Sequence, residues 1–152
     1  MSEFIPYSLS HRFLATFFFW GIPSPLDLRF QRISGLSREL TVSSYREGGE
    51  NAANLYFPES VHHGSLVMER GVTNVTPLTF LFDSVLGTGD PVYVDAVIML
   101  LDNNMLPVTT WTTSNALPVR WQVGDLDANS NTFLINTFEL RYQDMRLLGI
   151  RT

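Results

Sequence analysis

Alternation of apolar and polar residues with a period of two is the feature that most constrains the fold of this chain. Segments 39–46 and 117–124 alternate most cleanly, and a period of two is the spacing of a β-strand with one covered face. The apolar set predicted to face inward is Leu40, Val42, Val119, Trp121 and Val123. Both segments are therefore expected to be half-buried antiparallel strands with one polar face.

The rest of the chain predicts more strands and a single helix. Strands are expected at 11–20, 27–33, 64–70, 92–102, 108–111 and 132–143. The helical period appears at Leu78, Leu81, Phe82 and Val85, with Thr76-Pro77 as the start and Gly87 as the stop. Strands, then a helix, then strands predict a mainly β fold, an antiparallel β-barrel or sandwich with one flanking α-helix.

A long loop is expected between Gly48-Gly49 and about His62. Loops of this length are uncommon in compact domains and usually bind something or cross onto a neighbour. This loop carries Leu55, Tyr56 and Phe57 in a row, and three consecutive large apolar side chains need shelter. We therefore expect segment 47–60 to extend away from its own barrel and contact a neighbouring subunit.

Composition limits the classes of function. Residues 1–152 are one domain by length, with 45% hydrophobic and only 16% charged residues, so part of the apolar surface is expected in subunit contacts. The net charge is −5, and the chain has no lysine and no cluster of basic residues. This charge distribution disfavours nucleic-acid recognition. Cysteine is absent, which excludes disulfides and thiol chemistry. Segment 13–22 is apolar but is followed by Pro23 and Pro25, so a buried strand is preferred to a signal peptide, and no run is long enough to span a membrane.

Candidate chemical sites are weak. The loop 125–131 imitates the start of a calcium loop, yet Ser130 stands where a glycine is needed and Asn136 where a glutamate is needed. His62 and His63 are adjacent, so on a strand they point to opposite faces and cannot chelate one ion together. No nucleophile motif is present. We predict a protein that is not an enzyme and has no catalytic residue, no metal site and no cofactor.

Five short motifs occur in a characteristic order, with the helix between the second and the third. They are Tyr45-Arg46-Glu47-Gly48-Gly49, Glu69-Arg70-Gly71, Trp111, Asn115-Ala116-Leu117-Pro118 and Asp125-Leu126-Asp127-Ala128. In order and spacing the chain resembles the inner-tube proteins of contractile phage tails. It is most similar to those of the extracellular injection systems of the antifeeding-prophage and Photorhabdus virulence cassette type. The resemblance runs from about Phe13 to Tyr142.

This resemblance implies a structural role. Tube proteins of this type form hexameric rings that stack into a hollow tube, and the strands of each subunit join a continuous barrel around the lumen. It implies as partners five further copies, adjacent rings, baseplate spike or hub proteins, a surrounding sheath and cargo in the lumen. Assembly in the bacterial cytoplasm and release as part of a phage-tail-like extracellular particle or virion are implied as well. The predicted lumen-facing residues are Glu39, Thr41, Ser43, Arg120 and Gln122, and the predicted inter-subunit loop residues are Arg46, Glu47, Leu55, Tyr56 and Phe57.

The chain also departs from the family pattern. Phe57-Pro58-Glu59-Ser60 replaces a Pro-Gly turn, and Glu69 replaces a basic residue. Such divergence suits a specialised ring, such as the first one seated on the baseplate spike, with a bulk repeating tube subunit as the alternative. A free-standing β-barrel that binds a small ligand is the alternative from another class, but the polar row of Glu39, Thr41 and Ser43 does not suit an apolar cavity.

Overall fold

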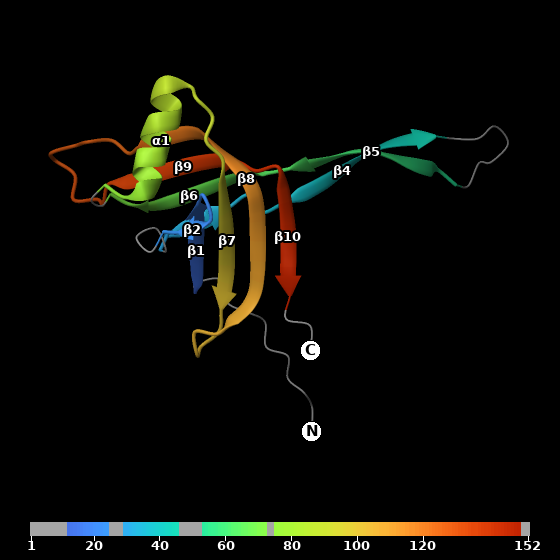
Figure 1. Cartoon of the computed structure of the whole chain (residues 1–152), viewed down its shortest axis with the longest axis horizontal. Coiled ribbons are helices and arrows are strands. Elements are labelled where there is room, and N and C mark those ends of the chain that lie inside the picture. The colour runs from blue at the N-terminus through green and yellow to red at the C-terminus, as the bar shows by residue number, and fades with distance from the viewer. Residues whose placement is uncertain (1–11, 25–28, 46–52, 73–74, 150–152) are drawn as a thin grey trace.

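The computed structural model describes residues 12–24, 29–45, 53–72 and 75–149. These residues form an antiparallel β structure with one helix, which confirms the predicted fold class (Figure 1). The elements are β1 (Phe13–Phe19), β2 (Ile22–Pro23), β3 (Arg32–Ser34), β4 (Arg38–Tyr45), β5 (Leu55–His63), β6 (Ser65–Gly71), α1 (Pro77–Thr88), β7 (Val94–Leu101), β8 (Pro107–Val123), β9 (Ile135–Arg141) and β10 (Asp144–Gly149).

Most strands belong to one sheet with the order β2-β1-β7-β8-β9-β6-β3, and β10 pairs with β8. The long strand β8 has two sets of partners. Its first part, up to Ala116, pairs with β7 and β10, and its second part, from Leu117, pairs with β9. We call β2, β1, β7, the first part of β8 and β10 sheet A, and the second part of β8 with β9, β6 and β3 sheet B. The two sheets run in different directions in Figure 1.

The change of partner along β8 occurs at Asn115, whose φ of 51° is left-handed. Asparagine tolerates this conformation better than most residues, so the chain bends there without breaking the strand. The sequence predicted two separate strands at 108–111 and 117–124. That prediction was wrong because the Asn115-Ala116-Leu117-Pro118 motif marks a bend within one strand of 17 residues.

The core lies between the two sheets, and the helix closes one side of it. Phe17 on β1 meets Phe30 edge-to-face, and Phe82 on α1 meets Phe138 on β9 in the same way, with ring centroids 6.0 and 5.0 Å apart. The guanidinium of Arg70 lies over both Phe30 and Phe138, at 5.2 and 5.1 Å from the ring centroids. A buried arginine thus joins the two aromatic pairs into one continuous core.

The helix largely follows its prediction. Thr76 is the N-cap, its hydroxyl accepts from the Thr79 N–H, and the predicted stripe of Leu78, Leu81, Phe82 and Val85 is buried. The predicted stop at Gly87 was wrong. Gly89 is the C-cap, because it adopts φ of 78° and donates its N–H to the Val85 carbonyl.

The region predicted as a long loop is mostly strand. Residues 55–63 form β5, which pairs with β4 from Arg38↔His63 to Tyr45↔Leu55, while Gly48-Gly49 lie outside the described residues. Leu55, Tyr56 and Phe57 are therefore strand residues, which corrects the loop prediction. The two strands project from the body as a separate two-stranded sheet, which we call the arm (Figure 1).

The expected burial of three apolar residues on β4 and β8 is also wrong, because these parts of the strands extend beyond the core. Leu40 and Val42 were expected to be covered, but they are about half exposed, because the arm extends beyond the core. Val123 was expected to face inward and is 43% exposed near the end of β8. The last strand expected from the sequence is 132–143, whereas β10 follows it in the structure and adds an edge to sheet A.

Candidate assembly interface

Sheet A has two open edges. Among the described residues, β10 pairs with β8 alone, and the outer edge of β1 is covered by β2 only at Phe18 and Phe19. Neighbouring strands are antiparallel from β1 through β7 and β8 to β10, so β1 and β10 themselves run in opposite directions. Unpaired edges invite pairing with another strand.

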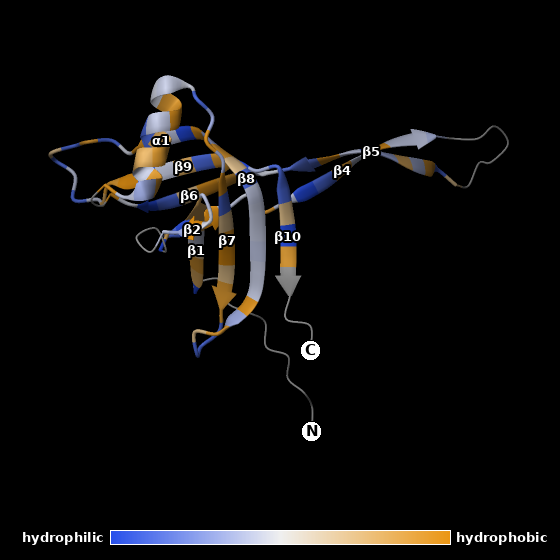
Figure 2. Ribbon diagram, viewed as in Figure 1, coloured by the Kyte–Doolittle hydropathy of each residue, from blue (hydrophilic) through white to orange (hydrophobic). Residues whose placement is uncertain are grey.

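One face of sheet A is buried and the other is open. Cross-strand partners lie on the same face, and one buried row is Phe17, Ala96, Thr113 and Met145. The neighbouring row, Thr16, Val97, Thr112 and Arg146, lies on the opposite face and is half-buried or exposed. Figure 2 shows that β1 and β7 are mainly apolar, whereas the first part of β8 is close to neutral. The open face is therefore a mixture of aliphatic side chains and hydroxyls with few charges.

The arm has two different faces. Leu40 opposite Val61, and Val42 opposite Pro58, form an apolar face that continues to Tyr56. The other face is polar near the body, where Glu39 opposes His62 and Thr41 opposes Ser60. Farther out it becomes aromatic, since Tyr45 and Phe57 meet edge-to-face with ring centroids 6.2 Å apart. Seven large apolar residues of the arm are exposed: Leu40, Val42, Tyr45, Leu55, Tyr56, Phe57 and Val61.

The base of the arm is firmly attached to the body through Tyr142. Its hydroxyl donates to the Gly35 carbonyl at 2.7 Å and accepts from the Ser37 N–H at 3.2 Å. Gly35 has φ of 93°, and a Cβ there would collide with the Ser65 carbonyl, so only glycine fits. The ring of His63 lies against Tyr142, with centroids 5.4 Å apart. These contacts fix the direction in which the arm leaves the body.

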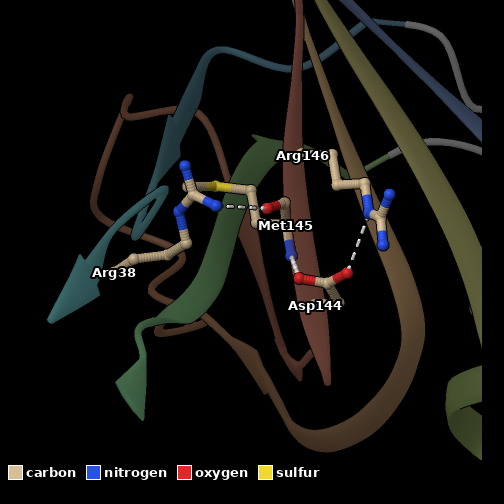
Figure 3. Close-up of polar contacts among 4 residues, drawn as sticks. All are labelled: Arg38, Asp144, Met145 and Arg146. Atoms are coloured by element: carbon tan, nitrogen blue, oxygen red, sulfur yellow. Dashed lines mark hydrogen bonds and ion pairs between the residues drawn. The ribbon is translucent and has the colours of Figure 1, made fainter. Parts of the chain in front are cut away.

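A second link joins the arm to the edge strand β10 (Figure 3). The guanidinium of Arg38 donates to the Met145 carbonyl at 3.1 Å, and the Met145 N–H donates to the Asp144 carboxylate at 2.9 Å. Arg146 donates to the other carboxylate oxygen at 3.1 Å. The hydrogen bond from Arg146 lowers the pKa of Asp144, while desolvation opposes it in part. Side chains thus occupy the backbone groups at the start of the β10 edge, and no strand among the described residues pairs with this edge beyond Met145.

An apolar groove lies between α1 and the β1–β2 hairpin. Its volume is about 580 Å³, and eight apolar residues and two serines line it. Three lining residues are large and well exposed: Trp20 (86%), Ile22 (70%) and Phe80 (66%). The groove joins residues far apart in the sequence, which is why no local pattern predicted it.

The predicted lumen residues fall into two groups. Glu39, Thr41 and Ser43 share the polar side of β4 in the arm. Arg120 and Gln122 are hydrogen-bonded neighbours on β8, and their cross-strand partners are Glu139 and Thr137. The structure does not bring the two groups onto one sheet. Whether either faces a channel stays a prediction.

Other predicted sites have structural explanations. Of the predicted inter-subunit residues, Arg46 and Glu47 lie outside the described residues, while Leu55, Tyr56 and Phe57 are exposed on the arm. Asp127 accepts from the Asn129 N–H at 3.0 Å and so acts as a turn residue. His62 contacts Ser60, whereas His63 contacts Tyr142. In the ranges that the structure describes, no cluster of three or more His, Asp or Glu residues could hold a metal ion.

Comparison with known proteins gives the family. A model of the T4-like virus tail tube protein gp19 family matches residues 10–146. The chain belongs to this tail tube family. This match confirms the resemblance to tail tube proteins that the sequence shows. No curated protein matches the chain.

Solved structures agree with this assignment. A chain in the cryo-EM structure of the anti-feeding prophage baseplate, six-fold symmetrised, is 61% identical to this one, with a TM-score of 0.89, covering 98% of this chain and 100% of that one. A chain of the extended sheath–tube complex of an extracellular contractile injection system, PVC, is 21% identical, with a TM-score of 0.78, covering 95% and 93%. A chain of the anti-feeding prophage cap is 19% identical, with a TM-score of 0.80, covering 98% and 96%. The last two show the fold alone. None of the described helices is long and apolar enough to cross a membrane.

Proposed function

We propose that this tail tube protein is a structural subunit of the tube of a contractile injection system and forms a six-membered ring at the baseplate end. The observation that carries the proposal is the identity of 61% over 98% of the chain to a component of a six-fold baseplate structure. Identity to chains of the sheath–tube complex and of the cap is only 21% and 19%. This contrast favours a specialised ring over the bulk repeating subunit. In this role the protein is not an enzyme and needs no cofactor.

The open edges of sheet A offer a way to form the ring. Because β1 and β10 run in opposite directions, β10 of one copy can pair antiparallel with β1 of the next copy when all copies have the same orientation. Repeating this contact around a symmetry axis joins every sheet A into one barrel and leaves no edge exposed. A free-standing ligand-binding barrel would not require two open edges.

The same geometry supports a channel wall that differs from the one predicted from the sequence. The open face of sheet A, with Thr16, Val97, Thr112 and Arg146, would line the channel of such a barrel, because both joining edges belong to this sheet. Glu39, Thr41 and Ser43 project on the arm and would meet other subunits instead. The partners in this proposal are the neighbouring copies, the adjacent ring, the baseplate hub or spike, the sheath and the cargo. The particle is extracellular after assembly in the bacterial cytoplasm.

A proline on the open edge of β10 tests the proposal. Amides two residues apart point to the same side of a strand, so the Leu147 N–H points outward like that of Met145. Leu147→Pro should therefore leave the subunit folded, because proline is tolerated on an edge strand, but should prevent rings. Leu147→Ala is the matched control and should still form rings. Circular dichroism and light scattering give the two readouts. Normal rings from the proline variant would refute edge pairing through β10.

A further inference from the structure

A strained turn that carries an exposed tryptophan lies at the rim of the apolar groove between α1 and the β1–β2 hairpin. Trp20 and Gly21 form the two-residue turn of this hairpin, with φ of 51° and 81°. A turn with positive φ at both positions is of type I′, which favours Asn-Gly. A bulky residue is strained at the first position, and this one leaves its indole 86% exposed on the rim of the groove. The chain thus accepts backbone strain to present an aromatic ring to the outside.

The arm provides a matching partner. Its outer part carries Tyr45, Leu55, Tyr56 and Phe57, and all four are exposed. The contacts at Tyr142 fix the base of the arm, so these side chains are presented in a defined direction. A projection whose outer described residues are largely aromatic and an apolar groove of about 580 Å³ are complementary in chemistry.

One chain cannot fill its own groove with its own arm. Figure 1 shows α1 at one end of the molecule and the arm projecting from the opposite end. The contact must therefore join two copies, and it is heterologous, because the arm of one copy meets the groove of another. Heterologous contacts repeat into closed rings or helical stacks, and a tube contains both kinds of assembly.

We infer that the outer part of the arm, with Tyr56 and Phe57, docks in the groove formed by Trp20, Ile22, Pro77 and Phe80 of a second copy of this chain. This inference rests on the proposed tube function and names the partner surface of the arm. Trp20 is the central contact, because aromatic side chains that become fully covered dominate interface energies.

The first test uses a substitution with opposite effects on the subunit and on the assembly. Trp20→Asn restores the preferred Asn-Gly turn, so the melting temperature of the dilute monomer should rise by about 2–8 °C. The same variant should assemble about 30-fold more weakly, because it loses the central aromatic contact. Assembly as strong as that of the wild type would overturn the inference. Weak assembly together with a lower melting temperature would also overturn it, since the strain argument would then be wrong.

The second test uses the absence of native cysteine, which makes engineered thiols unambiguous. Chains with Phe80→Cys are mixed with chains with Tyr56→Cys and oxidised under assembly conditions. A disulfide-linked pair of chains is expected in the mixture, and much less in either chain alone. Thr41→Cys, at the base of the arm, replaces Tyr56→Cys as the control and should not cross-link. If rings form without the cross-link, this inference fails and the tube function stands. If the wild type never assembles, the tube function itself fails.

Discussion

Replacing Phe82 by alanine tests whether the helix holds the core together. Phe82 is fully buried and meets Phe138 edge-to-face, with ring centroids 5.0 Å apart. A phenylalanine-to-alanine change at such a site costs about 3–5 kcal/mol of unfolding free energy, since both the transfer energy and a cavity contribute. This is a large share of the ~5–15 kcal/mol that stabilises a domain of ordinary size. We therefore expect the melting temperature of Phe82→Ala to fall by about 6–20 °C.

The same helix provides a matched control. Phe80 is two residues away and 66% exposed, so Phe80→Ala should change the stability of the monomer by no more than about 0.5 kcal/mol. Urea unfolding of both variants, followed by circular dichroism on chains dilute enough to be monomeric, measures the two changes. Equal stabilities for the two variants would refute the burial of the Leu81–Phe82 stripe against the sheets. A larger loss for Phe80→Ala would contradict the position of the helix altogether.

Two further predictions concern the helix end and the β10 edge. Gly87→Ala should stabilise the monomer by about 0.5–1 kcal/mol, because Gly87 lies within the helix with open space around it. Gly89→Ala should destabilise it by about 1–2 kcal/mol, because φ there is 78°. Thermal unfolding of the two variants shows at which glycine the helix stops. A stabilising Gly89→Ala together with a destabilising Gly87→Ala would place the stop at Gly87. The folded-state pKa of Asp144 is lowered, so its contribution to stability is present above the ordinary value of 3.8 and is lost as the pH falls through the folded-state pKa. Asp144→Asn should therefore make unfolding in acid less steep, and an unchanged acid profile would count against the Arg146 contact.

Local periodicity was sufficient for much of the fold. The apolar stripe of α1, the strand at 39–46 and the alternation of 117–124 depend on neighbours in the sequence, and all three elements are present. β5 could not be predicted in this way. It contains Pro58 and Glu59, and all of its residues except His63 are exposed. Its strand conformation depends on pairing with β4 across a bulge.

The sequence could not predict the surroundings of residues whose neighbours come from distant parts of the chain. In the sequence Arg70 belongs to a strand-end motif, yet in the structure its guanidinium is buried between Phe30 and Phe138 and donates to Thr76 at 2.8 Å. No composition rule places an arginine in a core. The groove likewise combines the Trp20 turn with Phe80 of the helix. By contrast, the expectation that Leu55, Tyr56 and Phe57 project away from the body needed only their local sequence, and all three are exposed.

The native mass of the purified chain tests the ring most directly. A ring of six copies predicts a species of about 103 kDa, six times the 17.2 kDa of one chain, with six-fold symmetry in negative-stain images. The ring should also appear as a hollow disc, because the proposed barrel would enclose a channel with the open face of sheet A as its wall. A species of 17.2 kDa at every concentration, with or without a bound small ligand, would contradict a ring-forming tube subunit and favour a free-standing barrel.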